Sequence, residues 1–144
     1  MTHAEIALAG HDEHFNCSQS VFAAFAPELG MNRAVALKIA TSFGAGMGRQ
    51  AATCGAVTGA YLAIALKYGM TDGADQAAKE KTYALVQEFA RRFKERQGGL
   101  ECRDLLGVDL SAPGGLELAN ERHLFSTRCS ALIRTAAEIL DEIL

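Results

Sequence analysis

Residues 44–66 read GAGMGRQAATCGAVTGAYLAIAL, a glycine-rich run that leads into an uncharged segment. Gly44, Gly46 and Gly48 permit positive φ and close approach of the main chain, so this run predicts a loop whose amides surround a small concavity. Thr53 is a suitable N-cap, which would put Cys54 at the first helical position. Because the helix dipole favours an anion there, we expect a lowered pKa for the Cys54 thiol.

The loop does not have the pattern of a nucleotide-binding loop. A P-loop ends in Lys-Ser or Lys-Thr, and neither pair follows the glycines here. No strand pattern precedes the loop either, as the dinucleotide-binding turn would require. The sequence therefore argues against phosphate binding by this loop.

The segment after Cys54 is apolar on all sides, which is typical of a buried helix. Gly55, Gly59 and Ala63 recur every four residues and form a row of small residues along which a second helix can pack closely. The apolar run ends at Lys67, short of the roughly 20 residues that a membrane span needs. We expect an all-α, compact bundle of five to six helices around this central Gly/Ala-rich helix, with no membrane span.

Length and composition favour one ordinary domain. The chain has 144 residues, a net charge of −3, two prolines and no tryptophan, so we expect a single helical domain over residues 1–144 with a full core. Basic residues do not cluster with aromatic ones, which argues against a nucleic-acid partner. The first residues lack the charged and apolar regions of a signal peptide, so the expected location is cytoplasmic.

Capping residues and hydrophobic periodicity divide the chain into helices. Asn16 followed by Gln19 forms a capping-box pattern, and Val35, Ile39 and Phe43 give the next helix an apolar position every four residues. The segment before the last helix has only a weak pattern. The predicted helices cover residues 2–13, 16 to about 30, 32–43, 54 to about 69, about 75–97, 101–107, and 126 or 127 to the end.

Two charged patterns have ordinary structural interpretations. His11 and His14 are three residues apart, a spacing compatible with metal binding, but such a pair at a polar helix end is usually solvated. Residues 91–96 are rich in basic side chains, and cations suit the C-terminus of a helix. We expect both to lie on solvated faces.

The four cysteines share one local context. The segments NCSQ, TCGA, ECRD and STRC each place sulfur in the first turn of a predicted helix, around Cys17, Cys54, Cys102 and Cys129. Four helix N-termini directed at one place would supply a positive field and many N–H donors, which stabilise thiolates and any anionic cluster that they hold. The alternative is that each cysteine is a small buried hydrophobic residue without a task.

With these residues the chain resembles the C_GCAxxG_C_C family, whose members are described as redox-active. The resemblance rests on Cys17 in NCSQSV, on Cys54 in CGAVTG, on Cys102 in CRDLLG and on Cys129. It departs from the pattern at Ala51, where the family often has glycine. A related domain occurs in split-Soret cytochromes, for which an iron–sulfur centre has been proposed. The resemblance therefore implies cluster ligation or thiol redox chemistry.

Three functions remain open from the sequence. In the first, the four cysteines bind an iron–sulfur cluster or another thiophilic metal for electron transfer to a redox partner protein, and Gly44, Gly46, Gly48 and Gly55 line the cofactor site. The second is a thiol–disulfide enzyme or sensor that uses Cys54 as the nucleophile and another cysteine to resolve it. The third is a structural protein with inert cysteines, in which the small-residue row forms the contact of a homodimer.

Overall fold

The computed structural model describes residues 1–144 and contains no strand. The chain forms eight right-handed α-helices, and α4 is a single turn of the opposite hand. The all-α prediction is confirmed, but five to six helices was too few. The elements are α1 (His3–Asp12), α2 (Cys17–Phe25), η1 (Ala26–Leu29), α3 (Arg33–Ala40), η2 (Thr41–Phe43), α4 (Gly44–Met47), α5 (Gly55–Tyr68), α6 (Gln76–Gln97), α7 (Cys102–Leu106), α8 (Gly115–Glu121) and α9 (Arg128–Ile143).

Polar caps begin several helices where the sequence predicted them. The Asn16 side chain accepts a hydrogen bond from the Gln19 amide, and the Gln19 side chain accepts one from the Asn16 amide, so the capping box is complete. Thr2, Asn32 and Asp75 cap α1, α3 and α6 in the same way through one side-chain oxygen each. Each cap satisfies amides that would otherwise lack a partner at the helix start.

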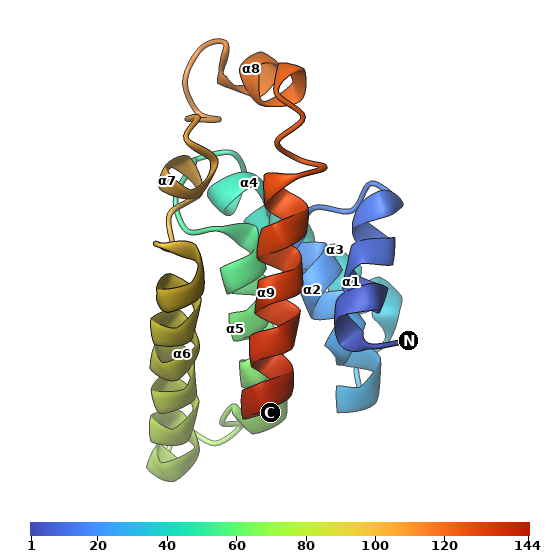
Figure 1. Cartoon of the computed structure of the whole chain (residues 1–144). Coiled ribbons are helices and arrows are strands. Elements are labelled where there is room, and N and C mark those ends of the chain that lie inside the picture. Colours follow the sequence, from blue (N-terminus) through green and yellow to red (C-terminus); the bar gives the residue numbers. More distant parts are fainter.

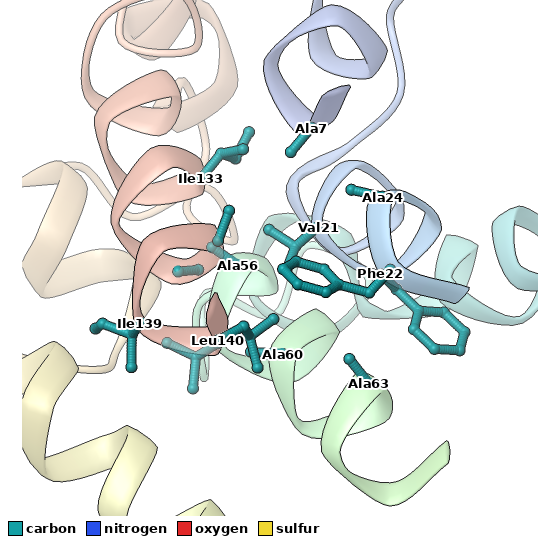
Figure 2. Close-up of a cluster of buried hydrophobic side chains, with 14 of the residues drawn as sticks. Ala7, Val21, Phe22, Ala24, Ala56, Ala60, Ala63, Ile133, Ile139 and Leu140 are labelled. Carbon is teal, nitrogen blue, oxygen red and sulfur yellow. The ribbon is translucent and has the colours of Figure 1, made fainter. Parts of the chain in front are cut away.

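The glycine- and alanine-rich α5 lies at the centre of the bundle. It packs against α2, α6 and α9, and its contact with α2 is the most extensive between any two helices (Figure 1). Figure 2 shows Ala56 and Ala60 of α5 between Val21 of α2 and Leu140 of α9. The small side chains of α5 let the larger ones of its neighbours fill the core, which confirms the predicted central helix.

The row of small residues on α5 meets α2 of the same chain. A β-carbon on Gly59 would lie 2.7 Å from the backbone oxygen of Ser18, so the two helix backbones touch at this point. One on Gly55 would lie 3.2 Å from the Cys17 β-carbon. Since α2 covers the row, a subunit contact along Gly55, Gly59 and Ala63 is not available, and that part of the structural hypothesis is wrong.

The directions of the helices bring several helix N-termini to one end of the bundle. The helices α2, α5 and α9 all begin at the same end, which is the upper end in Figure 1, and α4 and α7 lie there as well. The long α6 runs the opposite way and delivers the chain to α7 at that end. The fold therefore collects several helix N-termini in one region.

The outer helix α3 does not bury the apolar positions that the sequence singled out. Val35 and Ile39 remain 48% and 43% exposed, whereas Ala36 and Ala40 are fully buried. The helix α3 lies against α2, and alanine permits a closer approach than valine or isoleucine would. The spacing predicted the helix correctly, but the row of residues that is buried is Ala36 and Ala40 and not Val35 and Ile39.

The basic end of α6 is neutralised within the fold. Arg92 forms an ion pair with Glu142 at 2.9 Å, and Arg96 forms one with Glu138 at 3.0 Å, so this face of α6 is tied to α9. The interpretation as a solvated structural face fits these contacts. Among all the helices, none combines the length and the apolar character needed to cross a bilayer.

Two buried serines on α2, Ser18 and Ser20, are expected to affect stability in opposite directions when replaced by alanine. The Ser18 hydroxyl is fully buried without a hydrogen-bond partner, whereas the Ser20 hydroxyl donates to the Asn16 carbonyl at 2.8 Å. We expect Ser18→Ala to raise the free energy of unfolding by about 1 kcal/mol or more, because a buried unpaired hydroxyl costs about 1–3 kcal/mol. Ser20→Ala should lower it by about 1 kcal/mol. Urea denaturation of both variants checks this, and equal effects would contradict it.

Candidate functional site

The four cysteines line one cavity at the end of the bundle where the helices begin. The cavity has a volume of about 880 Å³, and the sulfur-bearing residues Cys17, Cys54, Cys102 and Cys129 all form part of its wall. Cys17 is partly exposed, the other three are buried, and no disulfide joins any pair. Residues separated by up to 112 positions in the chain are thus brought to one place.

Each cysteine lies at the start of a helix, as the sequence predicted. Cys17 is the first residue of α2, Cys102 is the first of α7, and Cys129 is the second of α9. Cys54 differs from the prediction because it is itself the N-cap of α5, and the helix begins at Gly55. Thr53, the predicted cap, lies in extended backbone instead.

An isolated antiparallel bridge places Cys54 beside Cys102. Thr53 pairs with Glu101, and the two hydrogen bonds around the bridge are made by the cysteine amides. The Cys54 amide donates to the Leu100 carbonyl at 2.8 Å, and the Cys102 amide donates to the Ala52 carbonyl at 2.6 Å. The sequence contains no strand signal here, so this short pairing is a tertiary feature that fixes two of the four cysteines.

The glycine-rich loop forms a left-handed helical turn. Ala45, Gly46, Met47, Gly48 and Arg49 have φ between 56° and 70°, and the Gly48 amide donates to the Gly44 carbonyl at 2.8 Å. Left-handed backbone costs a residue with a side chain roughly 1–2 kcal/mol, so the turn stores strain at its three non-glycine positions. Strained backbone of this kind is concentrated at functional sites.

Neighbouring groups hold the turn in this conformation. The Arg103 guanidinium donates to the Ala51 carbonyl at 3.0 Å, and the Ala52 amide donates to the Gly46 carbonyl at 3.0 Å. A β-carbon on Gly46 would lie 2.8 Å from the β-carbon of Cys102. The turn therefore packs directly against one of the cysteines, and only glycine fits at this contact.

All four glycines that the sequence proposed for the cofactor site lie on the cavity wall, namely Gly44, Gly46, Gly48 and Gly55. Ala51, where the resemblance led us to expect glycine, is fully buried and has φ +57°. Glycine would adopt this conformation without strain. The departure therefore has a conformational cost and leaves the cavity itself unchanged, because Ala51 is not part of its wall.

Burial controls the protonation of Cys54 and Cys102. Loss of hydration raises the pKa of the Cys54 thiol to about 11, although the nearby amides of Ala56 and Val57 oppose the rise. Burial also raises the pKa of Cys102 to about 12, with a further contribution from the negative charge that Cys54 and Cys129 would carry. The prediction of a lowered pKa for Cys54 is therefore wrong, because desolvation outweighs the helix start.

Cys17 and Cys129 form a close pair. The Cys17 thiol donates a hydrogen bond to the Cys129 sulfur, and this bond together with burial raises the pKa of Cys17 well above its ordinary value. The same hydrogen bond lowers the pKa of Cys129, and the positive charge of Arg128 acts in the same direction. Cys129 is thus the thiol that loses its proton most readily, whereas the sequence pointed to Cys54 for that role.

Arg128 also fastens the end of α9 to the cavity region. Its guanidinium donates to the Leu105 carbonyl at 2.9 Å and to the Gln97 side chain at 2.5 Å. These bonds join the start of α9 to the last turn of α7 and to the end of α6. Arg103 and Arg128 therefore act mainly by fixing the backbone around the sulfurs, a role that sequence spacing could not reveal.

The mouth of the cavity carries polar residues from distant segments. His11 has one ring nitrogen 2.6 Å from the Phe125 carbonyl and the other 3.1 Å from the Phe15 carbonyl, so it links α1 to the segment before α9. His14 lies on the wall without such contacts. The two histidines therefore have separate environments, and His11 is a structural link. Asn120 of α8 also lines the mouth, and no sequence signal pointed to it.

No group of three or more histidine, cysteine, aspartate or glutamate side chains is arranged to hold a metal ion. The four cysteines share a cavity, but their side chains do not form a ready set of ligands around one point. This arrangement differs from a structural zinc site, in which four sulfurs surround one ion at about 2.3 Å each.

Comparison with known proteins agrees with this cysteine pattern. A family model described as "Putative redox-active protein (C_GCAxxG_C_C)" matches residues 15–143. No curated protein and no solved structure matches the chain. The match covers all four cysteines, the left-handed turn and every helix except α1. The chain belongs to the C_GCAxxG_C_C family.

Proposed function

We propose that this protein binds an iron–sulfur cluster through Cys17, Cys54, Cys102 and Cys129 and uses it to transfer electrons to a redox partner. The observation that carries the proposal is the gathering of four unpaired cysteines on the wall of one cavity. Thiolates are the ligands that iron–sulfur clusters use in proteins.

The spacing of the side chains favours a group larger than one ion. Four sulfurs around a single zinc ion stand close together, since each zinc–sulfur bond is about 2.3 Å long. No such arrangement exists around the cavity. A [4Fe–4S] cluster attaches each cysteine to a different iron, so its ligands stand further apart, and a cavity of about 880 Å³ has room for it.

The environment of the thiols suits ligands that lose their protons only when metal binds. Burial keeps Cys54 and Cys102 protonated at neutral pH, with pKa values of about 11 and 12. A coordinated thiol is deprotonated outright, so cluster binding would release these protons. When bound, the cluster would supply the capacity to accept and donate an electron. The left-handed turn would offer backbone amides to its sulfur atoms, which raises the reduction potential.

Metal analysis after anaerobic purification and reconstitution with iron and sulfide tests the proposal. We expect iron and acid-labile sulfide in the protein together with visible absorption. Cys54→Ser and Cys102→Ser should each lose most of the iron, because the chain has only four cysteines and none is left to replace a lost ligand. Ser18→Ala is the matched control beside Cys17 and should keep the iron. A wild-type protein without iron, sulfide or colour would refute the proposal.

The contact between Cys17 and Cys129 favours a second candidate function, thiol–disulfide chemistry. The Cys129 thiolate would attack hydrogen peroxide to give a sulfenic acid and hydroxide, which takes up a proton from solvent. The Cys17 thiol would then attack the sulfenic acid and displace water to form a disulfide. This pair replaces the earlier choice of Cys54 as nucleophile. Mass spectrometry after one equivalent of peroxide should find a Cys17–Cys129 disulfide. Random pairing among the four cysteines would exclude this second candidate function.

A further inference from the structure

Much of the cavity wall carries no sulfur. The mouth is built from the end of α1, the left-handed turn and the segment around α8, and the whole cavity measures about 880 Å³. Small-molecule sites in proteins have volumes of about 300–1,000 Å³. The cavity is therefore large enough for a second ligand beside the cysteines.

Two nitrogen-bearing side chains at the mouth have no partner in the protein. Arg49 and His14 both line the cavity and are exposed to solvent, and neither side chain forms a hydrogen bond or ion pair. Both residues have left-handed backbone, with φ of 68° and 75°. At Arg49 glycine would relieve this strain, so the side chain is kept at a conformational cost. At His14 the left-handed backbone closes the end of α1, where the His14 amide donates to the His11 carbonyl and the Phe15 amide to the Gly10 carbonyl.

Arg49 and His14 belong to the wall of the same cavity, and their backbones lead to one contact at its rim. The Arg49 amide points at the Gly44 carbonyl at 3.4 Å, and a β-carbon on Gly44 would lie 2.3 Å from the Asn16 side chain. His14 is two residues before Asn16 in the chain. Arg49 and His14 therefore flank the contact between Asn16 and Gly44.

We propose that this rim binds a small oxyanion, with the Arg49 guanidinium and a ring N–H of His14 as its donors. Arginine presents a planar fork that pairs with two oxygens of a carboxylate or phosphate group, and such charge-assisted pairs are stronger than neutral ones. The neutral imidazole also has one N–H, so His14 donates in either protonation state. The carboxylate of Asp12 lines the same cavity and opposes the anion.

Calorimetric titration of the reduced, metal-free full chain tests this site, with inorganic phosphate and acetate as separate probes. We expect Arg49→Gln to weaken binding of the preferred probe at least tenfold, and Asp12→Asn to strengthen it severalfold. Arg122→Gln removes an exposed arginine outside the cavity wall and should leave affinity unchanged. The better probe identifies the group as phosphate or carboxylate. Unchanged affinity in Arg49→Gln, or equal losses in both arginine variants, would overturn the proposal.

Alkylation of Cys129 locates the anion. Cys129 lines the same cavity and is the thiol that loses its proton most readily, so an anion at the rim should slow its reaction with neutral iodoacetamide severalfold. The protection should vanish in Arg49→Gln and persist in Arg122→Gln. Protection that persists in Arg49→Gln would place the anion elsewhere and overturn the assignment. Both measurements use metal-free protein. A negative result would therefore refute the anion site without refuting the iron–sulfur proposal, and a protein without iron could still bind the anion.

Discussion

Gly46→Ala is expected to lose most of the iron bound by the reconstituted protein and to be less stable than Gly48→Ala by at least about 2 kcal/mol. Both glycines have left-handed backbone, with φ of 68° and 65°, so alanine carries the same conformational cost at both positions. They differ in surroundings. A β-carbon on Gly46 would lie 2.6 Å from the Ala52 nitrogen and 2.8 Å from the Cys102 β-carbon, whereas one on Gly48 meets nothing closer than 3.5 Å.

The excess cost of Gly46→Ala comes from overpacking, which typically costs about 1–3 kcal/mol and more where backbone must move. Relief of the clash requires displacement of Cys102 or of the bridge that holds it, so the effect reaches the proposed ligands. Urea denaturation and iron analysis of the two variants, each prepared in parallel, measure both consequences. Equal stability and equal iron content would show that the turn does not position Cys102.

Gly59→Val is expected to lower the free energy of unfolding by about 3 kcal/mol or more, at the upper end of the range for overpacked sites. A β-carbon there would lie 2.7 Å from the Ser18 oxygen and 3.0 Å from its Cα, and these are backbone atoms that cannot rotate away. The helices α2 and α5 would have to separate along their shared contact.

Two measurements distinguish this effect from a loss confined to the site. Gly73→Ala, at a position with nothing within 4 Å of the new β-carbon, should change stability only slightly. Because α2 carries Cys17 and α5 carries Cys54, separation of the helices should also lower the iron content of Gly59→Val. Wild-type stability in Gly59→Val would contradict the close contact between the two helices.

The helices themselves could be predicted because their signals are local. Asn16 with Gln19, Asn32 and Asp75 are caps whose partners lie within three residues, and the stripe through Phe89 and Phe93 repeats with the helical period. The short α7 was among the predicted helices, whereas α8 was missed because the segment before the last helix has only a weak pattern. The error at Val35 and Ile39 has another cause. Two neighbouring apolar rows lie on α3, and the close approach of α2 buries the alanine row instead of the row with the larger side chains.

The pKa values of the cysteines could not be predicted in the same way. The start of a helix is a local feature, and from it the sequence predicted a lowered pKa for Cys54. Desolvation depends on every neighbour that excludes water, and it raises the pKa of Cys54 to about 11. The lowered pKa of Cys129 needs Cys17 as its neighbour, which lies on another helix far away in the sequence.

The sequence by itself determined the helical class, the central small-residue helix and the placement of each cysteine at a helix start, since these follow from periodicity, capping and side-chain size. The tertiary structure alone decided that α2, α5 and α9 begin at one end, that Thr53 pairs with Glu101, and that the glycine run turns left-handed against Cys102. Those outcomes depend on packing between segments distant in the chain, where contact geometry and exclusion of water outweigh local preference.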